Sequence, residues 1–311
     1  MLNPVHLRTL TTVIRTGSFA DAARRLGYTG SAISQQIAAL ERAVKMPLFE
    51  RDAHSVRPTS AGNFIAQRAR ESLAALGSLD DDIRGMSQGA IGRLRIGSFP
   101  TASERLLPAM LAAYVRDHPD VEIALDEGEP DELVPLLQMA ELDLALVYRY
   151  KLVPHSWPRT LEATNLFDED LVLLLPKGHR LADGDLVPLG ELAEETWIST
   201  REDTSGASNL RRMCAGAGFA VQVDYRSNDY DVITNFVGSG LGIAFVPALG
   251  YVPNGDVVAA RLADVKMYRR VTVLHGSTKA NPAVVEAVEA LQSAVRALAD
   301  LTSGMAPMLT S

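Results

Sequence analysis

The stretch from Ser18 to Gly62 constrains this chain most, because it predicts two short helices, a turn and a loop in a fixed order. Ser18 and Thr29 are typical caps of helix N-termini, and Gly27 suits the left-handed end of the first helix. Apolar residues recur at helical spacing in both segments: Phe19, Ala22, Ala23 and Leu26, then Ile33, Ile37 and Leu40. The pattern predicts a helix–turn–helix.

The outward face of the second helix is polar and holds no acidic residue before Glu41. Its Gln and Ser side chains suit the edges of DNA bases, and a helix–turn–helix places this helix in the major groove. The alternative is a helical hairpin whose polar face only meets water. Arginines in the loop after Leu48 favour DNA, because they would reach phosphates as a wing. The predicted DNA-contacting residues are Thr29, Ser31, Ser34, Gln35, Gln36, Arg51, Arg57 and Thr59.

The charge distribution supports this interpretation. The whole chain has a net charge of −8, which by itself argues against DNA binding. Up to Arg70, however, it holds ten basic and four acidic residues, so this part is +6 and the remainder is −14. A basic N-terminal part joined to an acidic body is the asymmetry expected of a DNA-binding module with a second, different unit.

Several short motifs in this region resemble the N-terminal domain of LysR-type transcriptional regulators. They are ADAARRL from Ala20, SAISQQI from Ser31 with Leu40-Glu41, LFER from Leu48 and RPTSAG from Arg57, and their order and spacing match the family. The resemblance implies a winged helix–turn–helix that reads an operator with dyad symmetry. Gly30 departs from the family pattern, since many members carry a polar residue there.

A long amphipathic helix is predicted from Ser60 to about Gly85. Its narrow apolar stripe indicates a seam that pairs two chains, whereas the alternative is packing against its own domain. In the family this is the linker helix, which implies a homodimer and, by analogy, a homotetramer. The predicted dimerisation residues are Ile65, Leu73, Leu76, Leu79 and Ile83.

Beyond residue 90, alternating strand and helix patterns predict a mostly parallel α/β unit in two parts. This organisation resembles the family's effector-binding domain, a two-lobed (type 2) periplasmic-binding-protein-like fold. The expected domains are 1–59 for DNA binding, 60–89 for the linker helix and 90–302 for effector binding, followed by a loose tail over 303–311. Within the effector domain, the first lobe is expected over about 90–161 and 266–302 and the second over about 162–265.

Ligands of open α/β sheets bind beyond the carboxyl ends of strands, next to helix N-termini. Four such strand ends carry polar or aromatic side chains, and their hydroxyl and N–H groups favour a carboxylate, with Arg201 able to supply charge. The alternative for each Ser or Thr is a simple helix cap. The predicted effector-binding residues are Ser98, Pro100, Thr101, Ser103, Tyr148, Thr200, Arg201, Asn228, Asp229 and Phe245.

Other function classes find little support. The Gly238–Gly242 glycines follow a predicted helix and precede a strand, which is the wrong order for a dinucleotide loop. No metal-ligand spacing, phosphate loop or nucleophile motif is present, so no cofactor, no metal and no catalytic residue are expected. The single cysteine, Cys214, allows no internal disulfide and fits a reducing cytoplasm.

These patterns are compatible with three functions. The favoured one is a ligand-responsive LysR-type regulator, not an enzyme, that binds double-stranded DNA, a small-molecule effector and itself, can contact RNA polymerase, and does not bind membranes. The first alternative is an enzyme or carrier with a vestigial DNA-binding head. The second is an architectural DNA-binding oligomer without an effector.

Overall fold

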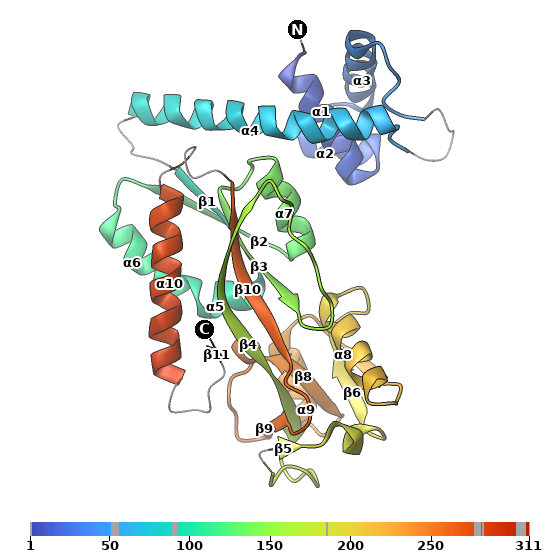
Figure 1. The fold of residues 1–311 in the computed structure, drawn as a ribbon, viewed down its shortest axis with the longest axis vertical. Coiled ribbons are helices and arrows are strands. Elements are labelled where there is room, and N and C mark those ends of the chain that lie inside the picture. Colours follow the sequence, from blue (N-terminus) through green and yellow to red (C-terminus); the bar gives the residue numbers. More distant parts are fainter. Residues whose placement is uncertain are drawn as a thin grey trace.

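The computed structural model of the chain describes residues 2–50, 56–88, 93–184, 186–276, 281, 283–302 and 309–310. A helical N-terminal unit, one long helix and a two-lobed α/β unit follow one another along the chain (Figure 1). This is the order of elements that the sequence predicts. The first four helices are α1 (Pro4–Thr16), α2 (Phe19–Leu26), α3 (Gly30–Val44) and α4 (Ser60–Gln88).

Side-chain caps begin the N-terminal helices, and those at Ser18 and Thr29 are the predicted ones. The side chains of Asn3, Ser18 and Thr29 accept hydrogen bonds from backbone N–H groups in the first turns of α1, α2 and α3. Gly17 and Gly27 end α1 and α2 in the left-handed region, with φ of 63° and 69°. The apolar stripes meet in one core, whose fully buried members include Leu10, Ile33, Leu40 and Leu48. The helix ends and the core of this unit therefore follow from local sequence patterns.

A short antiparallel ladder forms the base of the wing. The N–H of Glu50 donates to the carbonyl of Arg57 (2.8 Å), and the N–H of Thr59 donates to the carbonyl of Leu48 (3.0 Å). The start of α4 packs directly on this ladder, because a Cβ atom built on Gly62 would lie only 2.3 Å from the Leu48 carbonyl oxygen. Only glycine fits at this approach.

The predicted seam of α4 divides into two parts. Leu73 is only 6% exposed and packs with Ile65 in the core of its own helical unit, so the alternative interpretation holds for these two residues. Leu76 and Leu79 are 43% and 52% exposed, as expected of a face that awaits a partner. The side chain of Ile83 lies outside the described part. Packing within the helical unit and pairing with a second chain require the same apolar periodicity, so the sequence pattern could not distinguish the two roles.

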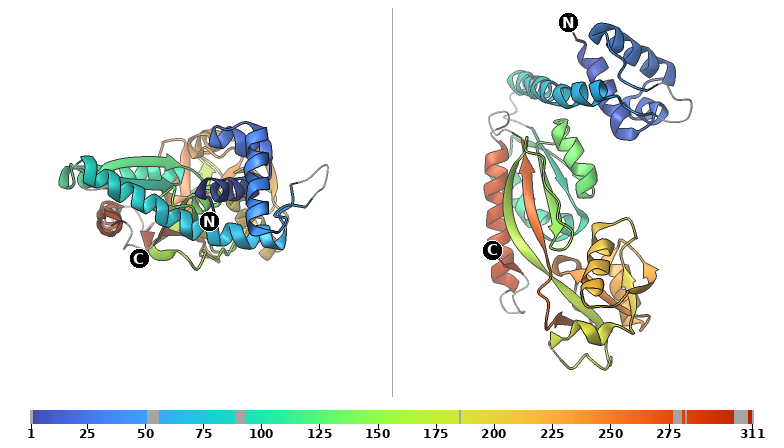
Figure 2. Two further views of the ribbon diagram at one scale, coloured as in Figure 1. Left: turned by 90° about the horizontal axis from the view of Figure 1, so that it is seen from above. Right: turned by 45° about the vertical axis from the view of Figure 1, so that its right-hand side comes forward.

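The first lobe is built from β1 (Arg93–Ser98), α5 (Pro100–Arg105), α6 (Leu107–Asp117), β2 (Glu122–Glu127), α7 (Pro130–Gln138) and β3 (Leu144–Tyr150). The second contains β5 (Leu186–Val187), η1 (Leu189–Leu192), β6 (Thr196–Ser199), α8 (Ser205–Gly216), β7 (Gln222–Arg226), α9 (Tyr230–Gly238), β8 (Ile243–Pro247), η2 (Ala248–Gly250) and β9 (Val257–Leu262). Strands β4 (Glu162–Pro176) and β10 (Tyr268–His275) join the lobes, and α10 (Ala283–Thr302) returns to pack on α6 (Figure 2).

The sheet runs in the order β2-β1-β3-β10-β4-β8-β6-β7. Within each lobe the βα units pair in parallel, while β10 is antiparallel to both β3 and β4. From Glu162 to Asp170, β4 pairs with β10; from Leu171 onward it pairs with β8. The change of lobe thus lies inside β4, near Asp170, and not before residue 162 as predicted. Residues 162–169 mix polar and apolar side chains without a clear strand pattern, so the sequence did not predict this half of β4.

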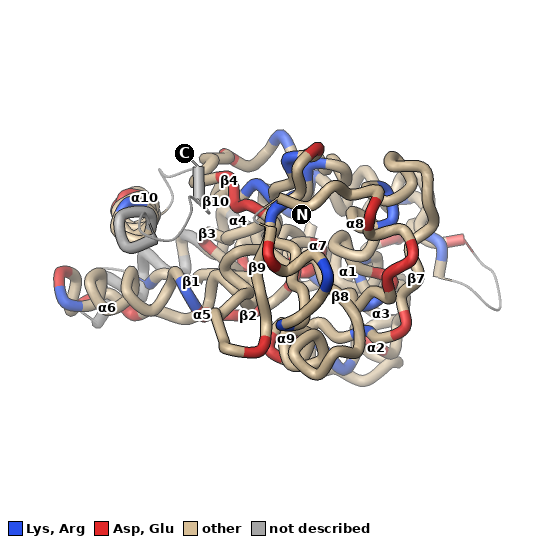
Figure 3. Tube along the Cα trace, turned by 90° about the horizontal axis from the view of Figure 1, so that it is seen from below, with Lys and Arg blue, Asp and Glu red and all other residues tan. Residues whose placement is uncertain are grey.

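The end of the chain also differs from prediction. Leu309–Thr310 forms a short strand, β11, which pairs with β4 opposite Glu169 and Asp168. These two residues are therefore not part of a loose tail, and the other residues after 302 lie outside the described part. Figure 3 views the molecule from the end opposite the helical unit, where acidic and basic positions are interspersed.

Gly62→Ala is expected to lower the free energy of unfolding of the helical unit by about 1–3 kcal/mol, because the new Cβ clashes with backbone. Gly77→Ala in the same helix is the matched control: nothing lies within 4 Å of its Cβ position. Its expected effect is a gain of about 0.5–1 kcal/mol from helix propensity. Chemical denaturation followed by circular dichroism measures both, and equal effects would contradict the close-contact explanation.

Candidate functional site

Three of the predicted DNA-contacting residues share one exposed face of α3. Ser31, Ser34 and Gln35 are all exposed. The Ser34 hydroxyl donates to the Gly30 carbonyl (3.0 Å), and the hydroxyls of Ser31 and Thr29 lie 3.0 Å apart. This face presents hydroxyl and amide groups without an adjacent acid, the chemistry that reads base edges in a major groove.

Other residues of the predicted set have partners within the protein. Gln36 is half-buried, and its side chain accepts a hydrogen bond from the Thr9 hydroxyl (2.5 Å), which ties α3 to α1. Thr29 caps α3. The Thr59 hydroxyl donates to the Pro47 carbonyl (2.9 Å) and accepts from the N–H of Gly62 (3.0 Å). Arg57 is exposed at the base of the wing, while Arg51 lies outside the described residues.

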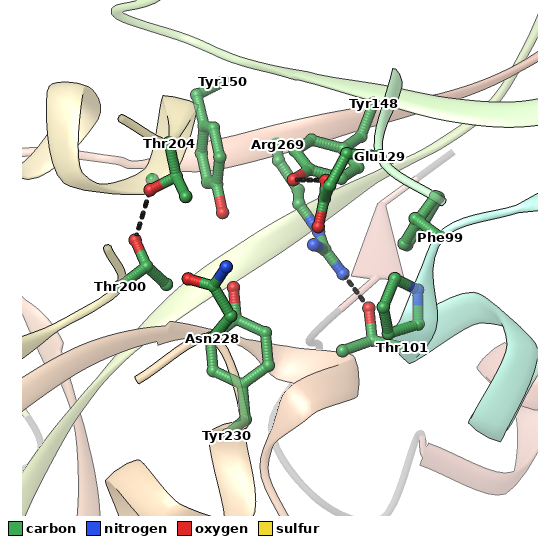
Figure 4. Close-up of a pocket in the computed structure, with 12 residues that line it drawn as sticks. Phe99, Thr101, Glu129, Tyr148, Tyr150, Thr200, Thr204, Asn228, Tyr230 and Arg269 are labelled. Carbon is green, nitrogen blue, oxygen red and sulfur yellow. Dashed lines mark hydrogen bonds between the residues drawn. The ribbon is translucent and has the colours of Figure 1, made fainter. Parts of the chain in front are cut away.

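A second candidate site lies between the two lobes (Figure 4). The cavity is partly open to solvent and has a volume of about 30 Å³, room for roughly two water molecules. Its walls come from the N-terminal ends of α5, α7, α8 and α9, from the end of β3 and from the start of β10. The lining residues are Phe99, Pro100, Thr101, Glu129, Tyr148, Tyr150, Thr200, Thr204, Gly206, Asn228, Tyr230 and Arg269.

The structure brings together about half of the predicted effector-binding residues. Those that line the cavity are Pro100, Thr101, Tyr148, Thr200 and Asn228. Phe245 lines a smaller cavity of about 10 Å³, which shares Tyr150 and Tyr230 with the first.

Four predicted effector-binding residues line neither cavity. The Ser98 hydroxyl is buried and donates to the Phe99 carbonyl (3.3 Å), and Ser103 lies further along α5. Asp229 caps α9. Arg201 is exposed, and its backbone N–H donates to the Asn228 side chain (3.0 Å). Arg201 therefore adds no charge to the wall.

Sequence reasoning missed Glu129, Tyr150, Tyr230 and Arg269. Glu129 and Tyr230 stand at the starts of α7 and α9, and Tyr150 ends β3, so the rule that found the predicted lining residues applies to them too. This rule does not apply to Arg269. It lies near the amino end of β10, which runs antiparallel to its neighbours, whereas the rule selects the carboxyl ends of strands.

Arg269 and Glu169 form the buried ion pair at the centre of the wall. Their side chains are 2% and 0% exposed, and the guanidinium donates both to Glu169 and to the Thr101 hydroxyl. The second oxygen of Glu169 accepts from the N–H of Leu249 (2.6 Å). Burial has the largest single effect and lowers the pKa of Arg269, but Glu169, Tyr150 and Tyr230 together outweigh it and raise that pKa above its ordinary value.

Aromatic rings enclose the same guanidinium. Its central carbon lies 4.8 Å from the ring centroids of both Phe99 and Tyr148. Burial raises the pKa of Tyr148 well above its ordinary value, and the pKa values of Tyr150 and Tyr230 rise for the same reason. All three phenols are therefore neutral at physiological pH and act as hydrogen-bond donors and acceptors.

Neither a metal site nor a membrane span is found over the described ranges. No group of three His, Cys, Asp or Glu side chains there is arranged to hold a metal ion. Among the helices that the structure describes, none has the length and apolar character needed to cross a bilayer.

Comparison with known proteins points to one family. Residues 4–63 match the family model for the bacterial regulatory helix-turn-helix protein, lysR family, and residues 87–296 match the LysR substrate binding domain. The HTH-type transcriptional regulator ShiR of Corynebacterium glutamicum is 31% identical over 73% of this chain and 76% of its own length. A probable hydrogen peroxide-inducible genes activator of Streptomyces viridosporus is 28% identical over 94% of each. A full-length OxyR variant of Pseudomonas aeruginosa shares the fold, with a TM-score of 0.63, 20% identity and 95% of each chain covered.

Arg269→Met is expected to lower the free energy of unfolding of the two-lobed unit by about 3–5 kcal/mol, because it leaves the Glu169 carboxylate buried and unpaired. The matched control is Arg270→Met, one residue along β10. Arg270 pairs with Asp168, but those side chains are 31% and 22% exposed, so a loss of about 1 kcal/mol or less is expected. Thermal denaturation of both variants measures these losses. Similar losses would contradict the larger contribution expected of the buried pair.

Proposed function

Because the chain belongs to the LysR family of DNA-binding transcriptional regulators with a domain for a small-molecule effector, we propose that the exposed face of α3 reads its operator. The observation that carries this proposal is the acid-free surface made by Ser31, Ser34 and Gln35, next to the wing that carries Arg57. Arg51 and Arg57 would contact phosphates and hold the helix in register. The proposed DNA-binding unit is residues 1–59.

A homodimer is the proposed DNA-binding form, with a homotetramer as the full assembly. Two copies related by a twofold axis match an operator with dyad symmetry, with half-sites about one helical turn apart. The exposed Leu76 and Leu79 support pairing through the second half of α4. We place the protein in the cytoplasm, where contact with RNA polymerase on the same promoter is open to it.

The cavity between the lobes is the proposed effector site of residues 90–302. Residues from both lobes line it, so a bound molecule would favour one separation of the lobes over another and thereby shift the population of DNA-binding arrangements. The sequence predicts a carboxylate effector from the hydroxyl and N–H groups at the strand ends, with Arg201 able to supply charge; of these groups, Arg201 is not part of this wall.

The cysteine of this chain argues against peroxide sensing through a thiol. Cys214 is the only cysteine in the sequence and is fully buried in α8. Burial raises its pKa to about 12, so the reactive thiolate is scarce at neutral pH. One such thiol cannot form a disulfide within the chain, so the function named for the peroxide-inducible relative is not part of this proposal.

Gln35→Ala is expected to change sequence preference, with a loss of about 1–3 kcal/mol at the base pair that it contacts. Arg57→Ala should weaken binding to all sequences and reduce the dependence of affinity on salt, because it removes a phosphate contact. Binding-site selection and footprinting on DNA upstream of the gene measure both effects. Gln222→Ala, on an exposed strand of the second lobe, is the control and should change neither. An unchanged selected site in Gln35→Ala would refute the assignment of this face.

Leu79→Glu is expected to dissociate the dimer and to lower operator affinity, because a charge would be buried in the proposed seam. Val252→Glu introduces the same charge at a similarly exposed apolar residue of the second lobe, and should leave the dimer intact. Sedimentation velocity distinguishes the two. A Leu79→Glu dimer as stable as that of the Val252→Glu protein would remove α4 from the interface.

A further inference from the structure

The carboxylate of Glu129 is the charged group of the interlobe cavity that lacks an opposite charge. It lines the cavity and accepts a hydrogen bond from the Tyr148 hydroxyl (2.5 Å), with its side chain directed into the space between the lobes (Figure 4). Within the part of the chain that the structure describes, no Lys, Arg or His side chain forms an ion pair with it. The other partner of this half-buried carboxylate is the backbone N–H of Glu132, in the capping box that starts α7. Both partners are neutral, so the carboxylate can still bind a cation.

Arg269 does not meet that demand. Its charge is balanced by Glu169, and its hydrogen bonds go to Glu169 and Thr101. The guanidinium is also held between the rings of Phe99 and Tyr148, which fixes it in the wall. With Arg269 and Glu169 cancelling each other, the charge that a ligand meets in this cavity is the negative charge of Glu129.

The remaining wall suits a cation as well. Tyr150 and Tyr230 present aromatic rings and neutral hydroxyls, and the Asn228 side chain lies beside them (Figure 4). Aromatic faces attract cations, and an ammonium group has three N–H donors and no acceptor. Carboxylate and phenol oxygens can accept such bonds, whereas the Asn228 amide oxygen already accepts from the backbone N–H of Arg201.

An anion finds less to bind here. The hydroxyls of Thr200 and Thr204, at the start of α8, are 2.6 Å apart and bond to each other. The guanidinium of Arg226 donates to the Thr200 backbone carbonyl (3.1 Å) and is not among the lining groups. A carboxylate in this cavity would lie in the field of Glu129, and the described wall offers no uncompensated cation to offset it.

We propose that the effector of this regulator carries an ammonium group, a primary amine or a small molecule that contains one, and that Glu129 is the residue that recognises it. This inference rests on the proposed use of the interlobe cavity as the effector site. The ammonium would replace the Tyr148 hydroxyl as the main partner of Glu129, with Tyr150 and Tyr230 around it. Glu129 would thus select cationic effectors over anionic ones of the same size.

Matched pairs of amines and carboxylates test the proposal with the full-length protein. The probes are butylamine and butyrate, benzylamine and benzoate, putrescine and succinate, and γ-aminobutyrate, which carries both groups. Their affinities are measured by calorimetry and thermal shift for the natural chain and for Glu129→Gln, which keeps the shape of the side chain and can still accept the Tyr148 hydrogen bond. Asp131→Asn is the control, because it removes the same charge from the same helix turn but does not line the cavity.

At least one amine is expected to bind the natural chain, and Glu129→Gln should weaken it by about tenfold or more, as for a lost hydrogen bond to a charged group. Asp131→Asn should leave that affinity unchanged. Binding of carboxylates in preference to amines, amine binding that Glu129→Gln does not weaken, or binding of none of the probes overturns the proposal. Footprints on the upstream DNA, recorded for the same three proteins, test DNA binding separately from effector binding. If all three proteins protect this DNA, the assignment as a DNA-binding regulator holds even when the ammonium proposal fails.

Discussion

The buried ion pair between Glu169 and Arg269 is the interaction on which the effector unit depends. The two residues face each other across β4 and β10, close to the point where β4 leaves the first lobe for the second. Through Thr101 the pair reaches α5 in the first lobe, and through the N–H of Leu249 it reaches η2 in the second. Two desolvated charges are stable only while both are present and fully hydrogen-bonded, so the pair fixes the relative position of four segments.

This structural use of Arg269 also determines the chemistry of the cavity. An arginine in a ligand cleft usually suggests an anionic ligand, because guanidinium groups match carboxylates and phosphates in shape and charge. Here the carboxylate of Glu169 already occupies that position, and the rings of Phe99 and Tyr148 cover the guanidinium. The cavity charge without an opposite charge belongs to Glu129, and the proposed ammonium effector follows from that charge.

How far the sequence predicts this molecule follows from the range of the interactions involved. Helix caps act within a few residues, so the local pattern is enough to predict Ser18, Thr29 and Gly27 at the ends of their helices. A rule of topology, strand ends beside helix starts, predicts lining residues such as Thr101. The ion pair at Arg269 joins residues one hundred positions apart and has no local pattern. The division of α4 into a core half and an exposed half is hidden too, since both halves share one periodicity.

Glu129 lies at the start of a helix that extends toward the DNA-binding unit. Glu129 precedes the first residue of α7, and its backbone N–H donates to the Glu132 side chain (3.0 Å) in a capping box. The same helix borders a cavity of about 550 Å³ whose opposite wall includes Arg15 and Arg25 of the helical unit. Spatial continuity alone does not establish coupling, because a ligand shifts an equilibrium only through contacts that differ between two states. The proposed ammonium group would supply such a difference, because it would draw the Glu129 carboxylate from Tyr148 at the turn that starts α7, the helix that borders the DNA-binding unit.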